Sequence, residues 1–105
     1  MINSLKNIFG LGTKVDYAQL IGNGAIVLDV RSRSEYAGGH VNGSINIPLD
    51  QLKDNLPKLK NKERAIITCC ASGIRSSSAK SILKQEGYTH VYNGGSWQSL
   101  KQYDK

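Results

Sequence analysis

Apolar residues gather in short runs that polar, glycine-containing segments separate, and this pattern indicates the fold. Residues 25–30 (AIVLDV) and 65–70 (AIITCC) are near-continuous apolar runs of strand length. Runs of this kind are typical of strands that a sheet buries on both faces. Two shorter strands are expected over residues 44–48 (SINIP), which Pro48 closes, and 90–93 (HVYN). The pattern therefore predicts a sheet with buried strands at its centre.

The segments around the first buried run carry the signals of helix termini. Asp16 is a candidate N-cap for a short helix over residues 16–21, which Gly22 would stop. Ser32 and Glu35 have the spacing of a capping box, which predicts a second short helix. Helices are therefore expected on either side of this strand along the chain.

Three further segments are expected to form the remaining helices. The first begins at Leu49, has apolar residues at amphipathic spacing and ends before Pro57. The second has Gly87 in the position that follows a helix C-cap. A turn at Gly94 and Gly95 is expected before the third. The three expected helices cover residues 49–56, 76–86 and 96–103.

Strands that alternate with helices at this spacing predict an α/β fold, with a central parallel sheet flanked by helices on both faces. The 105 residues allow one domain, which we place at residues 13–105 after a lead-in of residues 1–12. In such sheets, ligands bind beyond the carboxyl ends of the strands. The loops after Val30 and after Cys69 both fall at that edge. Function is therefore expected there.

Composition and charge narrow the function classes. The hydrophobic fraction of 39% and the charged fraction of 21% are ordinary for a globular domain. No apolar run approaches the ~18 residues of a membrane-spanning helix, and residues 1–12 lack the apolar region of a signal peptide. The net charge of +6 comes with no arginine-rich stripe or aromatic stacking platform. We therefore expect a cytoplasmic protein that binds neither nucleic acid nor membrane.

The segment CASGIRSSSAK, residues 70–80, is the most informative about chemistry. A cysteine ends a buried strand, and a glycine-containing loop, an arginine and the start of a helix follow. A free cysteine has a pKa near 8.5 and is only about 3% thiolate at pH 7. Helix amides and a nearby guanidinium both favour the anion, and Gly73 allows successive N–H groups to point at one centre. The loop is therefore suited to a thiolate, a persulfide or an oxyanion.

The same segment resembles the active-site motif of the rhodanese family, C-x-x-G-x-R-S. The residues that match it are Cys70, Gly73, Arg75 and Ser76. The resemblance covers nearly the whole chain from about Asp16 onward. Residues 28–52 are similar to the first conserved block of the family, and residues 87–97 are similar to its C-terminal block. Three blocks in the right order identify the chain as a member of this family.

The resemblance implies a parallel α/β fold and persulfide chemistry on Cys70. Cys70 would take a sulfane sulfur from a donor such as thiosulfate and pass it to cyanide or a thiol. Asp29 and Arg31 would buttress the loop through a hydrogen bond or an ion pair. The substrate-binding residues would be Ala71, Ser72, Gly73, Ile74 and Arg75.

The expected partners follow from the same resemblance. They are a small anionic sulfur donor and a thiol or thioredoxin-like acceptor, and the protein is expected to be a monomer or a weak dimer. No metal or organic cofactor is needed for this chemistry. The two histidines beside adjacent cysteines do not form a zinc ligand set.

Two features depart from the family's pattern. The family often has a tryptophan four residues beyond the Gly-Gly pair, where this chain has Ser99, and Trp97 lies two residues earlier. The loop also has no lysine and only one arginine, whereas rhodaneses with more cationic loops handle thiosulfate readily. These departures bear on the packing of the last helix and on the choice of donor.

The two adjacent cysteines leave alternatives for the nucleophile and the reaction. Counted from Cys70, four residues precede Arg75, which is the loop length of sulfurtransferases. Counted from Cys69, five precede it, which is the spacing of cysteine phosphatases and arsenate reductases. Successive strand residues point to opposite faces, so both thiols cannot enter one loop. Cys70 is the expected nucleophile, and Cys69 is expected to fill the core, with a resolving thiol as its alternative. A phosphatase or reductase and a non-catalytic binding module are the other function classes.

Overall fold

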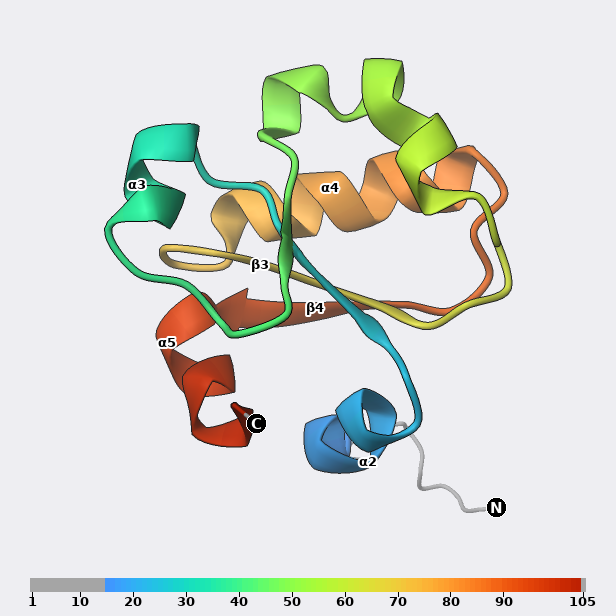
Figure 1. The fold of residues 1–105 in the computed structure, drawn as a ribbon. Coiled ribbons are helices and arrows are strands. Elements are labelled where there is room, and N and C mark those ends of the chain that lie inside the picture. Colours follow the sequence, from blue (N-terminus) through green and yellow to red (C-terminus); the bar gives the residue numbers. More distant parts are fainter. Residues whose placement is uncertain (1–14, 105) are drawn as a thin grey trace.

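The computed structural model describes residues 15–104, in which four parallel strands form one sheet (Figure 1). All three pairings are parallel, and β1 and β3 occupy the centre. In order across the sheet, the strands are β2 (Ile45–Asn46), β1 (Ile26–Asp29), β3 (Ile66–Cys70) and β4 (Val91–Ser96). The two long apolar runs therefore form the central strands, as expected. The expected lead-in, residues 1–12, lies outside the described residues.

Helical segments cover both faces of the sheet, which confirms the predicted α/β architecture (Figure 1). On one face, Leu28 and Val30 pack with Ala79 and Leu83 of α4 (Ile74–Gln85). On the other face, Val27 packs with residues of α2 (Tyr17–Gly22) and α5 (Trp97–Leu100). Alternation of side chains along β1 thus builds two separate apolar clusters.

The helix termini largely follow the local signals in the sequence. The side chain of Asp16 accepts a hydrogen bond from the amide of Gln19 and caps α2. Ser32 and Glu35 form the complete capping box at the start of α3 (Arg33–Ala37). α4 begins at Ile74, two residues before the expected start, because Gly73 takes a left-handed conformation (φ +102°) and turns the chain there.

The helix expected over residues 49–56 is wrong in type and in extent. The segment forms two 3₁₀ helices, η1 (Leu49–Gln51) and η2 (Lys53–Leu59), and Pro57 lies inside the second. Asn55 has non-helical backbone angles, and its side-chain amide donates to the carbonyl of Gln51 over 2.8 Å. The helix therefore restarts after Asn55, so Pro57 lies in a first turn, where its missing N–H is not needed.

The turn expected at Gly94 and Gly95 is also wrong, because both residues belong to β4. The register changes from Thr68 opposite Asn93 to Cys70 opposite Ser96, so one strand gains a residue and bulges. A Cβ atom on Gly94 would lie 2.7 Å from Cγ2 of Ile67, a separation that only glycine avoids. The bulge lies beside the end of β3 that carries Cys70.

The C-terminal segment is shorter in helix than expected. Ser96 caps α5 by accepting a hydrogen bond from the amide of Gln98, and a 3₁₀ helix, η3 (Lys101–Tyr103), follows.

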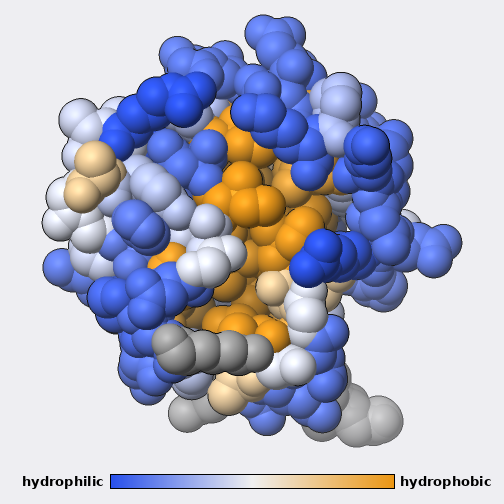
Figure 2. All heavy atoms as spheres, in the orientation of Figure 1, coloured by the Kyte–Doolittle hydropathy of each residue, from blue (hydrophilic) through white to orange (hydrophobic). Residues whose placement is uncertain are grey.

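In Figure 2, apolar side chains reach the surface in the middle of the molecule, and hydrophilic residues surround them. Among residues 15–104, no helix has the length and apolar character that crossing a membrane requires.

Candidate active site

The two cysteines at the end of β3 face opposite sides of the sheet. Cys70 packs in the cluster of Val30 and Ala79, on the side that α4 covers, whereas Cys69 packs in the cluster of Val27 and Leu100. Neither residue has exposed surface, and neither forms a disulfide. Only Cys70 therefore borders the loop that leads into α4.

Backbone amides of this loop surround the Cys70 sulfur. The amide of Gly73 donates to Sγ over 3.0 Å, and the amide of Ser76 donates over 3.4 Å. The Cys70 thiol also lies within hydrogen-bonding distance of Oγ of Ser76, at 3.5 Å. These groups come from the start of a helix, where amides have no intrahelical partner. The loop therefore has the geometry of an anion site centred on one sulfur atom.

The surroundings of Cys69 and Cys70 shift the pKa values of the two thiols in opposite directions. Burial alone raises the pKa of Cys70, but the hydroxyl and amide of Ser76 and the amides of Gly73 and Ser72 outweigh it and lower the pKa to about 7. Burial raises the pKa of Cys69 to about 12, and the carboxylate of Asp29 adds to the effect. At neutral pH, a large share of Cys70 is thiolate while Cys69 remains a thiol.

Asn93 of β4 holds this loop in place, a role for which no local sequence pattern is a signal. Its Nδ2 donates to the carbonyl of Gly73 over 3.2 Å. Its Oδ1 accepts from the hydroxyl of Ser76 over 2.6 Å and from the amide of Gly95 over 2.9 Å. Oγ1 of Thr68 donates to the carbonyl of Ser76 over 2.9 Å. The sheet thus fixes the first turn of α4 through two polar side chains.

Arg75 does not hydrogen-bond to the sulfur in this structure. Its guanidinium makes a bidentate ion pair with Glu35 of α3, with N–O distances of 2.7 and 3.0 Å. Both side chains are about two-fifths exposed, at 38% and 37%. The pairing lowers the pKa of Glu35 to about 2, chiefly through the hydrogen bond from Arg75. Arg75 therefore links the Cys70 loop to α3 and lies at the rim of the site.

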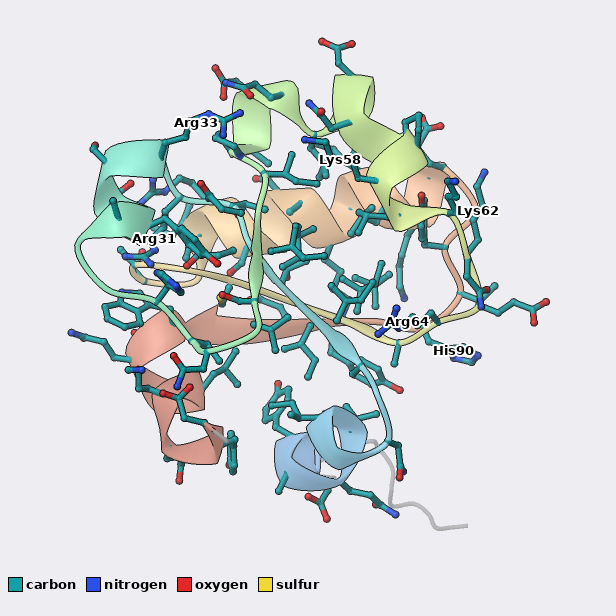
Figure 3. The ribbon with its side chains drawn as sticks, in the orientation of Figure 1. Arg31, Arg33, Lys58, Lys62, Arg64 and His90 are labelled. Carbon is teal, nitrogen blue, oxygen red and sulfur yellow. The ribbon has the colours of Figure 1, made fainter. Side chains whose placement is uncertain are left out.

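Asp29 and Arg31 form a buried ion pair at 2.7 Å, but they support a different segment from the one expected. Arg31 donates to the carbonyls of Glu35 and Gly39 and stacks 4.5 Å from the ring of Trp97. Figure 3 shows Arg31 between α3 and α5. The pair therefore buttresses residues 31–39 and lies beside Cys69, on the other face of the sheet from Cys70.

Trp97 lies two residues before the position at which the rhodanese family often has a tryptophan, where this chain has Ser99. Its ring covers Arg31 and lies against Gly39, where a Cβ atom would be 3.0 Å from the ring. Trp97 thereby joins α5 to the segment after β1. The earlier position of this tryptophan is compatible with a packed last helix.

The remaining loop residues differ in exposure. Ala71 and Ser72 are exposed, and Ile74 keeps 76% of its surface accessible, an unusual value for a large apolar side chain. The cationic side chains Lys62 and Arg64 lie at the opposite end of the molecule from this loop (Figure 3). Within residues 15–104, Arg75 is therefore the cation that belongs to the loop itself.

A groove opens beside the loop. It encloses roughly 330 Å³, and its lining is mostly apolar. The lining residues are Val30, Ser32, Pro48, Leu49, Asp50 and Arg75. The groove therefore lies where the segments after β1, after β2 and after β3 meet.

The curated proteins to which this chain is similar include enzymes with different named activities. The chain is 41% identical over 69 residues to thiosulfate sulfurtransferase PspE of Escherichia coli, covering 65% of this chain and 66% of the relative. It is 32% identical over 74 residues to the tRNA uridine(34) hydroxylase of Erwinia tasmaniensis, covering 66% of this chain and 21% of the relative. The chain thus spans less than two thirds of the length of each of these relatives.

Solved structures and a family model point the same way. A rhodanese with anions from E. coli superimposes with a TM-score of 0.67 at 37% identity, over 70% of this chain and 88% of that one. A human single-domain sulfurtransferase gives 0.72 at 26% identity, over 85% and 91%. The model of the rhodanese-like domain matches residues 13–102. The chain therefore belongs to the rhodanese-like domain family.

Proposed function

We propose that the protein is a sulfurtransferase that carries sulfane sulfur as a persulfide on Cys70. The observation that carries this proposal is the group of donors around Sγ, namely the amides of Gly73 and Ser76. A thiolate accepts these hydrogen bonds before the reaction, and the lowered pKa of Cys70 favours the thiolate at neutral pH. The same preorganised donors stabilise negative charge on a persulfide.

The proposed reaction has two steps in which atoms and charges balance. The Cys70 thiolate attacks the outer sulfur of thiosulfate, an S–S bond forms to Sγ, and the S–S bond of thiosulfate breaks. Sulfite leaves with the electron pair, and the outer sulfur of the persulfide carries the negative charge. Cyanide then takes this sulfur as thiocyanate and returns the electron pair to Sγ. Covalent catalysis of this kind gives ping-pong kinetics.

In the cell, we propose a thiol as the acceptor, either a small molecule or a thioredoxin-like protein. A thiolate attacks the outer sulfur of the persulfide in the same way as cyanide and leaves as a persulfide itself. The exposed loop residues Ala71, Ser72 and Ile74 surround the nucleophile and would meet such an acceptor first.

Two other functions are possible for a member of this family. A phosphatase or arsenate reductase would use the longer loop counted from Cys69, whose side chain is buried on the far face of the sheet. A binding module would need no nucleophile, and the donors around Cys70 and its lowered pKa would have no purpose there. The site geometry favours sulfur transfer over both.

The direct test is the mass of the protein after incubation with thiosulfate. We expect an adduct of about 32 Da, one sulfur atom, on the peptide that contains Cys70. Cyanide should remove it with release of one equivalent of thiocyanate, and dithiothreitol should remove it as well. Hydrolysis of p-nitrophenyl phosphate without any sulfur adduct would instead show that the protein is a phosphatase. If the protein has neither activity, a non-catalytic binding module is the remaining function.

A further inference from the structure

The groove beside the Cys70 loop has a chemical character that thiosulfate does not use. Val30, Pro48 and Leu49 provide apolar walls, and the volume of roughly 330 Å³ exceeds what a small inorganic anion fills. None of the three residues is required by the proposed sulfur chemistry. The groove is therefore suited to an apolar group that enters together with the reacting sulfur.

Backbone hydrogen bonds connect this groove to the nucleophile. The amide of Val30 donates to the carbonyl of Cys69 over 3.0 Å, directly before Cys70 in the chain. The amide of Leu49 donates to the carbonyl of Val30 over 3.1 Å. Val30 and Cys70 also share one apolar cluster, and Arg75 belongs both to the loop and to the groove lining. The groove therefore adjoins the loop that surrounds Cys70, and its lining shares Arg75 with that loop.

The charges at the rim disfavour a doubly charged donor. Glu35 holds both guanidinium nitrogens of Arg75 that face it, so the cation of the loop is already neutralised. Asp50 adds a second carboxylate to the groove lining. Two carboxylates and one paired cation surround a donor there. Because the Coulomb energy is proportional to the charge of the donor, the repulsion on a singly charged donor is half of that on a dianion such as thiosulfate.

We propose that the preferred donor of this site is a singly charged organic sulfane-sulfur compound, whose apolar substituent occupies the groove lined by Val30, Pro48 and Leu49. The inference rests on the proposed sulfurtransferase function. For an organic thiosulfonate, the Cys70 thiolate attacks the outer sulfur and the S–S bond breaks. The sulfinate then leaves with the electron pair, and Cys70 keeps the sulfur as a persulfide anion. An organic persulfide would react likewise and release its thiolate.

A series of donors tests the proposal on the unmodified protein. Methane-, propane- and benzenethiosulfonate are compared with thiosulfate, with cyanide as acceptor, by the rate of thiocyanate formation. We expect kcat/KM to rise about fourfold for each methylene that the groove buries, and all three organic donors to exceed thiosulfate. The rise should appear for the donor half-reaction, since cyanide is the same throughout.

Two pairs of variants locate the effect. Leu49→Ala removes one wall, and the ratio of the propane to the methane donor should fall about fourfold. Ile82→Ala removes the same number of carbons from the core on α4, away from the groove lining, and should keep the ratio. Glu35→Gln preserves the capping box and frees Arg75. It should raise kcat/KM on the order of threefold for each unit of donor charge. Glu63→Gln, an exposed carboxylate outside the site, is its control.

The outcomes separate this inference from the function on which it rests. If thiosulfate yields thiocyanate but kcat/KM is flat or falls along the organic series, the groove does not bind the donor and the inference is wrong. If Leu49→Ala and Ile82→Ala change the donor ratio equally, the groove is not responsible. If no donor yields a persulfide or thiocyanate, the sulfurtransferase function itself fails.

Discussion

The hydroxyl of Ser76 lies 2.6 Å from Oδ1 of Asn93 and 3.5 Å from Sγ of Cys70. This hydroxyl has one hydrogen, and the sulfur and the amide oxygen can both accept it. When Cys70 is a thiol, its S–H points to Oγ of Ser76 and the hydroxyl donates to Asn93. When Cys70 is a thiolate, the sulfur competes for the same hydrogen. The acidity of the nucleophile therefore depends on a residue of β4 that does not touch it.

Ser76→Ala removes the hydroxyl that competes between these two acceptors. We expect the pKa of Cys70 to rise by about one unit from its value of about 7, because a hydrogen bond to a charged group contributes about 1.5–3 kcal/mol. The pH dependence of iodoacetamide alkylation measures this pKa. Ser77→Ala, at the neighbouring exposed position, is the matched control. An unchanged titration in Ser76→Ala would show that the backbone amides alone set the acidity.

Asn93→Asp tests the loop from the side of the sheet. The carboxylate keeps the acceptor for Ser76 and Gly95 but loses the Nδ2 donor to the carbonyl of Gly73. It also places a negative charge near the sulfur. We expect a larger rise in the pKa of Cys70 than Ser76→Ala causes, together with slower sulfur transfer at pH 7. A lower pKa in the alkylation assay would contradict this view of Asn93.

The two cysteines should respond very differently to substitution. Cys70→Ser should reduce thiocyanate formation below detection, because the hydroxyl is not ionised and cannot hold sulfur. Cys69→Ala should keep activity within about threefold and lose about 1 kcal/mol of stability to the small cavity that it leaves. Urea unfolding and the cyanide assay measure both. The reverse pattern would place the reaction on the other face of the sheet.

The pH profile follows from the acidity of Cys70. Since the reactive form is the thiolate and its pKa is about 7, kcat/KM for the donor should rise about tenfold per unit below pH 7 and level off above it. Folding lowers this pKa, so the matching contribution to stability is fully present above the ordinary thiol pKa. It is lost as the pH falls through about 7. A rate that continues to rise to pH 9 would show an unperturbed thiol.

The bulge in β4 makes a prediction about stability alone. Gly94→Ala puts a Cβ atom 2.7 Å from Cγ2 of Ile67 and 2.9 Å from Cδ1 of Leu100, and should cost about 1–3 kcal/mol. Gly22→Ala, at the end of α2, meets no atom within 4 Å and should be neutral or stabilising by up to about 1 kcal/mol. Thermal unfolding of the two variants compares them. Equal melting temperatures would show that β4 shifts enough to accommodate a Cβ atom at residue 94 without loss of stability.

Much of the fold could be predicted because its signals are local. The two long apolar runs and the capping box of Ser32 and Glu35 each lie within a few residues, and the structure has them. The motif residues are contiguous, so the sequence also predicts the amides that converge on Cys70. The short-range geometry of a strand, a glycine loop and a helix start determines where these amides point.

What could not be predicted depends on residues far apart in the chain. Glu35 reaches Arg75 across 40 positions, and Asn93 reaches Gly73 across 20. The second contact also depends on the bulge in β4, which shifts the register of the last strand. The resemblance implies that Asp29, at the end of β1, buttresses the Cys70 loop, but side-chain alternation along β1 directs it to the other face of the sheet. Sequence proximity to the sheet edge does not identify the face.

The burial of Cys69 has a practical consequence. A folded molecule offers one reactive thiol to an alkylating reagent, because burial raises the pKa of Cys69 to about 12 whereas the loop lowers the pKa of Cys70 to about 7. Modification of the second thiol therefore requires the sheet to open. With Cys70 blocked beforehand, the rate of alkylation at Cys69 measures that opening, and its ratio to the alkylation rate in denaturant gives the free energy of the opening. The chain thus contains a built-in reporter of its own stability beside its reactive centre.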